Sequence, residues 1–226
     1  MTAAPSPSTP ELTAIVDYGA GNLRSVQKSF ERAAAALDAR DGRARDIIVT
    51  REAAAIARAD RLVLPGVGAF AACAAGLNTA PGVIDALRQS AIDERKPFLG
   101  ICVGMQLLAT CGLEFGETPG LDWIGGSVKR LEAGPDRRIP HMGWNTVIPT
   151  RAHPVFDALG DAVDLYFVHS FYFDVENAED CAAVCAYGGA VAAAVARDNI
   201  LGVQFHPEKS QAAGLEIIDA FLRWTP

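Results

Sequence analysis

The stretch "FLGICVGMQLL" (98–108) decides the fold. Its apolar start, directly after Pro97, predicts a buried strand, and its apolar second half predicts a helix that ends before Gly112. The turn between them is Gly-x-Cys-x-Gly, with Cys102 in the middle. This pattern is typical of a nucleophile elbow, in which small neighbours allow a strained backbone to lift one side chain above the sheet. The expected helix would point backbone N–H groups at the Cys102 sulfur and favour the thiolate, whereas a small buried cysteine is the alternative.

Two other stretches repeat the order of strand, glycine-rich turn and helix: "LTAIVDYGAGNLRSVQKSFERAAAAL" (12–37) and "RLVLPGVGAF" (61–70). Three such units predict a parallel sheet. From about Leu121 to Ala196, runs such as "VDLYFVHSFYF" (163–173) and "CAAVCAYGGAVAAAVA" (181–196) predict antiparallel strands and hairpins. A late strand and loop, "ILGVQFHPEKS" (200–210), and an amphipathic helix, "AAGLEIIDAFLRW" (212–224), follow. We therefore expect an α/β fold with a central mixed, largely parallel sheet.

The composition favours a single domain. The 226 residues are 50% hydrophobic and 21% charged, which is enough for one sizeable core. The first residues are rich in Pro, Ser and Thr, so we assign 1–11 to a disordered tail and 12–226 to one domain. The charged stretch "DARDGRARD" (38–46) is expected to form a surface loop.

Charge and cysteine content exclude several classes of protein. A net charge of −7 and the lack of a basic block argue against a nucleic-acid partner. The tail lacks the basic and apolar regions of a signal peptide, and no apolar run reaches the roughly 18 residues that span a membrane. The five cysteines, an odd number, fit a reducing cytoplasm.

The remaining cysteines and histidines suggest no metal site. Cys181 and Cys185 lack a second pair at zinc-ligand spacing and are expected in strands or the core, while Cys73 and Cys111 lie in apolar helical contexts. Two histidines near prolines, His141 and His153, are expected in loops, from which His141 could touch the rim of an active site. We predict neither a metal nor a cofactor.

A base for the Cys102 thiol is available in "GVQFHPE" (202–208). Side chains two positions apart on extended backbone point to the same side, so Glu208 can orient the imidazole of His206. Cysteine, histidine and carboxylate together form a thiol-nucleophile triad, in which the histidine moves protons and the acid fixes its tautomer. Alone, "HPE" is more typical of a solvated turn, so the joint occurrence with the elbow carries the interpretation.

Acyl transfer also needs donors for the developing oxyanion. In "LPGVGAF" (64–70), two glycines follow an apolar strand, so the loop Gly66, Val67, Gly68 can turn backbone N–H groups toward the nucleophile, with help from the N–H of Val103. The alternatives are a plain turn or a phosphate-binding loop. The Gly-Lys-Ser/Thr ending of a P-loop is missing.

With these motifs, the sequence resembles the class I glutamine amidotransferase family: "GICVGMQ" and "GVQFHPEKS" are similar to its cysteine and histidine–glutamate motifs. "VDYGAGNLRSV", "LPGVGAF", "IPHMGWN" and "YFVHSFY" stand in the order found in the glutaminase subunits of imidazole glycerol phosphate synthases within that family. The resemblance spans roughly Ile15 to Ser210. Val103 and Ala20 depart from the Leu and Pro that the family often has there.

The resemblance implies a three-layer amidotransferase fold and glutamine hydrolysis through a Cys102 thioester, with Cys102, His206 and Glu208 as catalytic residues. Ammonia would pass to a TIM-barrel cyclase subunit for histidine biosynthesis. By the same resemblance, L-glutamine would be held by Gln106, Glu114, His169, Ser170 and Phe171. The cyclase would contact Tyr18, Asn22, Trp144, Asn145, Tyr166 and Lys209, although each of these residues could instead be an ordinary loop or core residue.

Two other functions remain open at this point. The chain could be the glutaminase of another synthase, such as those that make anthranilate or GMP, but "PHMGWN" and "YFVHS" weigh against this. It could also be a catalytically silent regulatory protein. The intact set of Cys102, His206 and Glu208 weighs against that possibility.

Overall fold

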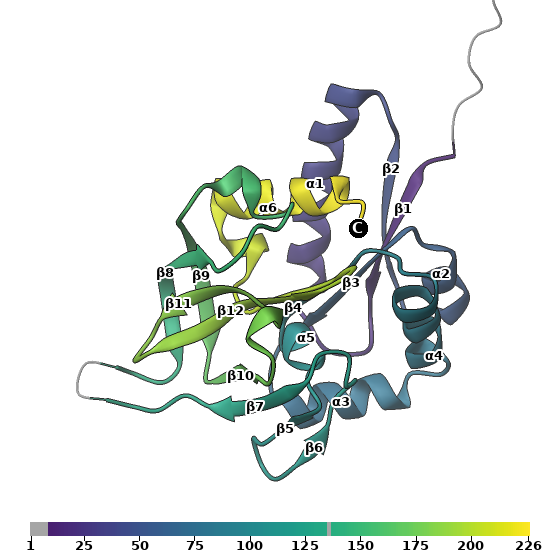
Figure 1. Ribbon diagram of the computed structural model, residues 1–226. Coiled ribbons are helices and arrows are strands. Elements are labelled where there is room, and N and C mark those ends of the chain that lie inside the picture. The colour runs from purple at the N-terminus through teal and green to yellow at the C-terminus, as the bar shows by residue number, and fades with distance from the viewer. Residues whose placement is uncertain (1–8, 135–136) are drawn as a thin grey trace, which may run out of the picture.

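The computed structural model describes residues 9–134 and 137–226, and Figure 1 shows its elements in chain order. The helices are α1 (Leu23–Asp41), α2 (Ala53–Arg58), α3 (Phe70–Thr79), α4 (Val83–Arg88), α5 (Val103–Gln106) and α6 (Gln211–Arg223). The strands are β1 (Glu11–Val16), β2 (Arg45–Thr50), β3 (Arg61–Gly66), β4 (Phe98–Cys102), β5 (Cys111–Gly112), β6 (Thr118–Pro119), β7 (Gly126–Arg130), β8 (His141–Pro149), β9 (Val163–His169), β10 (Phe171–Val175), β11 (Cys181–Ala186), β12 (Ala190–Arg197) and β13 (Ile200–Val203). Short π and 3-10 turns are η1 (Gln89–Asp93), η2 (Asp157–Leu159), η3 (Ala178–Asp180) and η4 (Pro207–Lys209).

Nine of these strands form one mixed sheet in the order β2-β1-β3-β4-β13-β12-β11-β8-β9. The half from β2 to β13 is parallel, and the half from β13 to β9 is antiparallel. β3 and β4 are buried along their whole length, as expected of parallel strands covered on both faces. The prediction of a mixed, largely parallel sheet is confirmed, as is the hairpin of β11 and β12.

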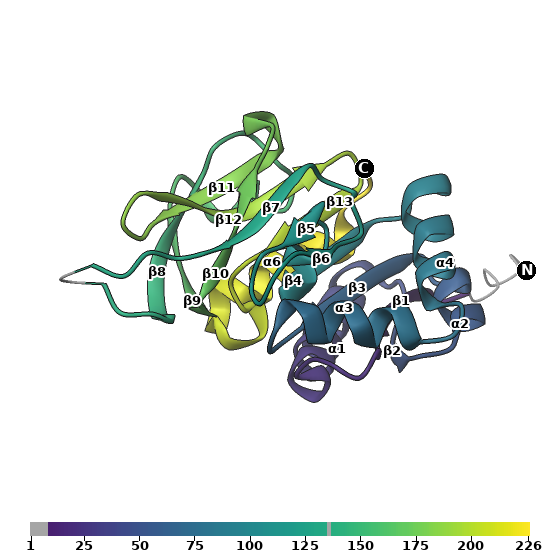
Figure 2. The same ribbon diagram turned by 90° about the horizontal axis from the view of Figure 1, so that it is seen from below.

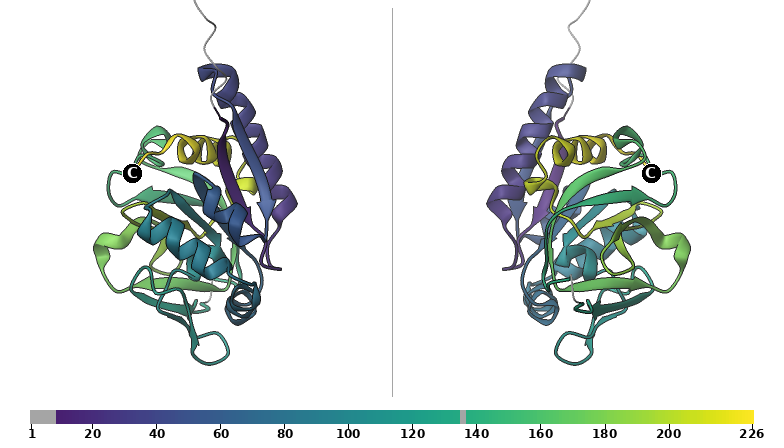
Figure 3. Two further views of the ribbon diagram at one scale, coloured as in Figure 1. Left: turned by 90° about the vertical axis from the view of Figure 1, so that its right-hand side faces the viewer. Right: turned by 90° about the vertical axis from the view of Figure 1, so that its left-hand side faces the viewer.

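Helices cover both faces of the large sheet (Figures 2 and 3). α1 and α6 pack together on one face. On the other face lie α2 to α5 and a second, four-stranded sheet of order β10-β7-β5-β6, whose strand β10 contacts β12. The predicted three-layer architecture is confirmed. The second sheet is an addition that the sequence did not predict.

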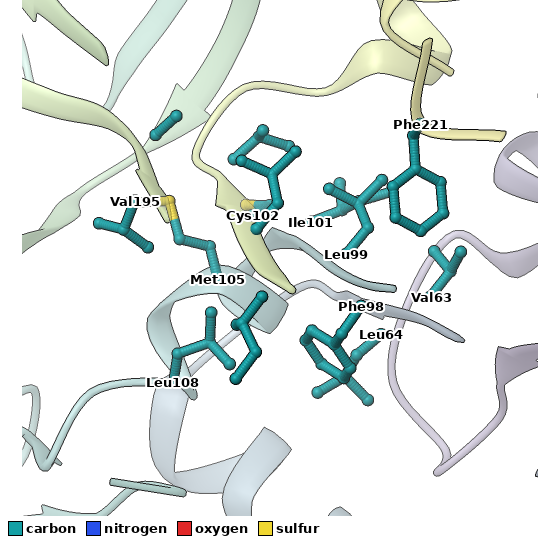
Figure 4. Close-up of a cluster of buried hydrophobic side chains, with 14 of the residues drawn as sticks. Val63, Leu64, Phe98, Leu99, Ile101, Cys102, Met105, Leu108, Val195 and Phe221 are labelled. Atoms are coloured by element: carbon teal, nitrogen blue, oxygen red, sulfur yellow. The ribbon is translucent and has the colours of Figure 1, made fainter. Parts of the chain in front are cut away.

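The core is built on β3 and β4, whose side chains alternate between the two faces (Figure 4). On one side Val63, Leu99 and Ile101 lie near Phe221 of α6, and on the other side Leu64 lies near Phe98. All five of the β-strand side chains are at most 1% exposed. The apolar runs therefore anchor the two strands that end at the predicted nucleophile.

The expected helix after Cys102 is wrong in its length. α5 has only four residues, and the chain then turns into β5, which contains both Cys111 and Gly112. The cause is tertiary: the carbonyls of Leu107 and Leu108 accept hydrogen bonds from the segment 121–124 instead of continuing a helix. Cys111 is therefore a strand residue, contrary to the prediction.

The charged stretch 38–46 is not a surface loop. α1 continues to Asp41, Gly42 closes it in the left-handed conformation, and β2 begins at Arg45. The Arg45 side chain is buried and pairs with Asp38 and Asp41, which explains the charge density of the stretch. Most of the predicted tail, 1–8, lies outside the described residues, and β1 begins at Glu11, one residue before the expected boundary. The division into this tail and one domain stays a prediction.

The described helices can be compared with the length of a membrane span, and the described polar side chains with the needs of a metal site. In residues 9–134 and 137–226, no single helix is long and apolar enough to cross a membrane, although α3 with the segment Val83–Asp93, bent by 97°, has the length and composition to do so as a pair. Within the same ranges, no three His, Cys, Asp or Glu side chains are placed to hold a metal ion.

Candidate active site

Three neighbouring parallel strands bring the site together at their carboxyl ends. β4 lies between β3 and β13, and Gly66 at the end of β3 pairs with Cys102 at the end of β4. On the other side, Ile101 pairs with Val203, three residues before His206. The parallel register therefore places the "LPGVGAF" loop and the "HPE" turn on either side of Cys102.

Cys102 has the backbone of a nucleophile elbow. Its φ of 55° and ψ of −113° are unusual for a residue with a side chain and cost about 1–3 kcal/mol. The two flanking glycines make this turn possible: a Cβ on Gly100 would lie 2.5 Å from the Gly104 carbonyl oxygen, and one on Gly104 would lie 1.8 Å from the Leu64 carbonyl oxygen. Because α5 is a single turn, a long-helix dipole does not act on the thiol as predicted. The local N–H groups remain.

His206 is held by Glu208 at the predicted spacing. Glu208 Oε1 lies 2.8 Å from His206 Nδ1, and both side chains are 2% exposed. Burial by itself lowers the pKa of His206, but its contacts with Cys102 and Glu208 outweigh this and raise the pKa to about 9. Nε2 of His206 has no hydrogen-bond partner within the described part of the chain. The ring is thus oriented and poised to hold a proton beside the thiol.

A cavity of about 420 Å³ opens over this pair. Its lining contains, of the predicted site residues, Cys102, His206, Val67, Gly68, Val103, Gln106, Glu114, His169, Ser170, Phe171 and Lys209. A larger cavity of about 550 Å³ lies between α3, α4 and residues 119–123 and contains none of them. The smaller cavity is the candidate site, because it holds a nucleophile with a base and the larger one does not.

The oxyanion candidates form the wall next to Cys102. Gly68 has a φ of +94°, and the exposed Val67 between the two glycines directs its carbonyl oxygen to the Cys73 thiol, which donates to it at 3.4 Å. Gly66 is packed tightly, since an added Cβ would lie 2.7 Å from the Gly104 nitrogen. The loop backbone is therefore unobstructed at Gly68, whereas at Gly66 it is closely packed against neighbouring backbone.

The predicted substrate residues are fixed by the protein itself. Both amide hydrogens of Gln106 are used, by the Phe171 carbonyl at 3.0 Å and by Gln204 Oε1 at 2.9 Å, so only its own oxygen is left for a ligand. A Glu114 carboxylate oxygen accepts from the Phe70 backbone N–H at 2.7 Å. These bonds set the orientation of both polar groups before any ligand binds.

One neighbour of the site was missed, and a second was assigned to the wrong kind of element. Gln204 is fully buried and donates to Cys102 Sγ at 3.7 Å. His141 belongs to β8 and is buried against His169, so the loop expected for it is wrong. A polar Gln inside the apolar run "GVQFH" could have identified the first, whereas only the strand pairing of β8 with β9 reveals the second.

The predicted partner-facing residues divide into two groups. Trp144 and Tyr166 make an edge-to-face pair on one face of the sheet, Lys209 Nζ lies 5.9 Å from the Tyr166 ring centre, and Asn22 is exposed. Tyr18, only 5% exposed, is a core residue, because its ring lies beneath Gly66 and Gly76. Asn145 points to the opposite face of β8 from Trp144 and donates toward His141. Tyr18 is therefore covered by the rest of the chain, and the Asn145 amide faces away from Trp144, while partner contact by both residues stays a prediction.

Comparison with known proteins agrees with this geometry. The family model of class-I glutamine amidotransferases matches residues 14–223. The chain is 51% identical over 218 residues to the imidazole glycerol phosphate synthase subunit HisH of Ruegeria pomeroyi, covering 95% of this chain and 100% of the relative. It is 52% identical over 219 residues to the subunit of that name in Caulobacter vibrioides, covering 96% of this chain and 100% of the relative.

Solved structures support the fold. A structure described as a glutamine amidotransferase aligns with a TM-score of 0.66 at 18% identity, covering 92% of this chain and 96% of the other. A putative GMP synthase protein from Thermoplasma acidophilum aligns with a TM-score of 0.62 at 19% identity, covering 95% and 94%. These identities speak for the architecture only. The family match over most of the chain and the relatives at about half identity show that the chain belongs to the class-I glutamine amidotransferase family, alongside the HisH subunits.

Proposed function

We propose that this chain is the glutaminase subunit of an imidazole glycerol phosphate synthase. It hydrolyses L-glutamine and delivers ammonia to a TIM-barrel cyclase subunit for histidine biosynthesis in the cytoplasm. One observation carries the proposal: Cys102 stands at a strained elbow beside the His206–Glu208 pair, in a chain that is 51% identical to a HisH subunit. The loop Gly66–Gly68 completes the parts that acyl transfer needs.

The chemistry runs in two steps. The Cys102 sulfur attacks the side-chain amide carbon of glutamine and forms a C–S bond, and the C–N bond breaks as His206 gives its proton to the departing nitrogen. Ammonia leaves and a thioester remains. Water, activated by the now neutral His206, then attacks the thioester carbon and releases glutamate, which returns the thiol and imidazole to their starting state. Backbone N–H groups of the Gly66–Gly68 loop and of Val103 stabilise the oxyanion in both steps.

Glutamine recognition follows from the fixed polar groups. The Glu114 carboxylate, held by Phe70, complements the ammonium group of the amino acid. The Gln106 side-chain oxygen supplies a second acceptor in the cavity lining, because the amide hydrogens are used elsewhere. The backbone from His169 to Phe171 closes the remaining side of the cavity.

The cyclase subunit would dock on the outer face of β8. Met142, Trp144 and Ile148 alternate along that strand and are 62%, 49% and 49% exposed. Large apolar side chains grouped in this way mark protein interaction surfaces. The β8 face adjoins the cavity, since Val168 and Lys209 line the cavity and Val168 pairs with Met142 across the strands. Ammonia released at Cys102 would therefore leave close to the partner.

Co-expression with a candidate cyclase subunit tests the proposal. We expect the two chains to co-purify and the complex to form product with glutamine as the nitrogen source, with one glutamate released per product. A complex that uses only free ammonia would contradict the proposed activity. A chain that instead supports anthranilate or GMP formation would reassign the synthase.

Replacing Glu208 with glutamine should reduce turnover in this complex by about 10- to 100-fold and change KM little. The substitution keeps the shape but removes the charge that orients and stabilises the imidazolium. The effect is limited because a cysteine nucleophile is intrinsically strong. Since Glu208 helps raise the His206 pKa to about 9, the alkaline limb of kcat/KM should move to lower pH in the variant. Parental turnover with an unchanged pH profile would assign Glu208 to structure alone.

A further inference from the structure

Two buried histidines form a direct ring-to-ring hydrogen bond at the wall of the cavity, which His169 lines. His141 of β8 and His169 of β9 are cross-strand partners, 3% and 6% exposed. His141 Nδ1 lies 2.8 Å from His169 Nε2. Neither residue is a nucleophile or base in the mechanism above. The pair therefore needs a different explanation.

The outer nitrogens of the pair are also occupied. His169 Nδ1 lies 2.8 Å from the Phe171 carbonyl oxygen, and His141 Nε2 lies 3.1 Å from Asn145 Nδ2. The His141 ring is stacked between Tyr187, with ring centres 3.9 Å apart, and Phe167, with centres 4.7 Å apart. The ring can therefore neither turn nor leave its plane without disturbing both neighbours.

These contacts determine where the protons are. The Phe171 carbonyl can only accept, so His169 must carry its proton on Nδ1, and in a neutral ring its Nε2 is then an acceptor. His141 must donate to that acceptor from Nδ1, which leaves its own Nε2 to accept from the Asn145 amide. Each link thus fixes the next, and both rings are neutral with the proton on Nδ1. Burial lowers the pKa of each ring to about 4, which agrees with neutral rings at physiological pH.

The chain of bonds continues beyond Phe171 to the nucleophile. The Phe171 carbonyl also accepts from Gln106, Gln106 donates to Gln204, and Gln204 donates to Cys102. At its other end, Asn145 is adjacent in sequence to Trp144 on the β8 face and donates its second hydrogen to the Ala186 carbonyl. An unbroken series of hydrogen bonds therefore joins the β8 strand to Cys102.

We propose that His141 and His169 are positioning residues, which act as a neutral, Nδ1-protonated pair to hold the Phe171 carbonyl and through it the Gln106 amide in the orientation that binds glutamine. The role rests on the proposed function for its substrate. The geometry of the glutamine site then depends on the position of β8, the strand on which the partner would dock. The competing explanation is that the two rings only fill space in the core.

Nitrogen NMR of the ¹⁵N-histidine-labelled full chain tests the proton positions without any assay of activity. The chain has four histidines, so the spectrum is simple. At neutral pH, we expect His141 and His169 each to show a protonated Nδ1 and an unprotonated Nε2. A protonated Nε2 on either ring would overturn the hydrogen-bond order. This result stands whether or not the chain proves to be a glutaminase.

Kinetics of the complex test the positioning role. His141→Leu has a similar volume but lacks the donor, and we expect it to raise KM for glutamine about five- to tenfold with kcat within about twofold, the effect of losing one buried neutral hydrogen bond. His141→Asn should recover most of the loss, because its amide nitrogen stands near the place of Nδ1. The matched control is His153→Leu, which removes a histidine that is buried near Phe156 and Trp224, away from the cavity.

The outcomes separate the explanations. Equal KM values for His141→Leu, His153→Leu and the parent would assign the pair to packing alone. Equal losses in His141→Leu and His141→Asn would do the same, since the donor would then make no difference. A parent complex that consumes no glutamine would contradict the proposed function instead, and the NMR spectrum would still decide the proton positions.

Discussion

Replacing Cys102 with alanine is expected to abolish glutamine-dependent product formation by the complex, a loss of at least about 10⁴-fold, because no thioester can form. Ammonia-dependent synthesis by the cyclase subunit should continue at the parental rate. Alanine is smaller than cysteine and fits the same elbow, whose neighbours, Gly100 and Gly104, are unchanged. The measurement is product formation by parent and variant complexes, with glutamine or with an ammonium salt.

A covalent probe supplies the control. A glutamine-analogue electrophile should label Cys102 in the parent much faster than the other four cysteines, because only Cys102 lies in the cavity beside a histidine. Burial raises the pKa of Cys73, Cys181 and Cys185, which makes these thiols poorer nucleophiles. If the Cys102→Ala complex formed product neither from glutamine nor from an ammonium salt, a structural residue would have been taken for the nucleophile. Labelling of all five cysteines at equal rates would lead to the same conclusion.

The parts of the fold that local sequence encodes were predictable. β3, β4 and the elbow follow from apolar runs that end in glycines, because the residue pattern of a buried strand and that of a tight turn are each contained in a short stretch of sequence. The small sheet was not predictable in this way. Its strands β5 and β6 have two residues each, which is too short for any periodicity, and they exist only because β5 pairs with β7 and β6 pairs with β5. A different tertiary contact, with the segment 121–124, ended α5 after one turn.

The site shows the same division. Cys102, His206 and Glu208 stand in short motifs whose spacing carries their geometry. Gln204 and His141 gain their places from contacts across strands, which no single motif contains. The burial of Tyr18 was left open for a related reason, because a motif identifies a residue type but not whether neighbouring elements cover it. Sequence therefore predicted how these three side chains are arranged better than it predicted the contacts around them.

The second large effect is a switch: glutamate release should be about 100- to 1,000-fold faster in the complex with bound cyclase ligand than in the isolated glutaminase chain, which is the rate effect of one oxyanion donor. In the structure, the Val67 carbonyl is held by Cys73, and the adjoining Gly68 has a φ of +94°. A peptide flanked by glycines can rotate at low steric cost, so the donor needed by the oxyanion can be turned inward when the partner docks.

The partner has a physical route to His206, which lines the same cavity as this loop. The His206 backbone N–H donates to the Tyr166 carbonyl at 2.8 Å, and Lys209 lies over the Tyr166 ring. Tyr166 in turn contacts Trp144 on the β8 face. Docking on that face is therefore connected to His206, the proposed general base, through Trp144 and Tyr166. The required effect, about 3–4 kcal/mol, is slightly above the usual range for one coupling and is within reach of docking and ligand binding together.

Glutamate release should be measured for the isolated chain, for the complex, and for the complex with cyclase ligand. Equal rates in all three would rule out the switch and leave the partner as an ammonia acceptor over a preformed oxyanion hole. Trp144→Ala and Lys209→Ala should each reduce the stimulation by ligand, while Ile92→Ala, which removes an exposed apolar side chain from the segment after α4, should leave it unchanged. A full ligand response in both Trp144→Ala and Lys209→Ala would keep the switch but place its contacts elsewhere, because the β8 face would then not carry the signal that turns the Val67 peptide.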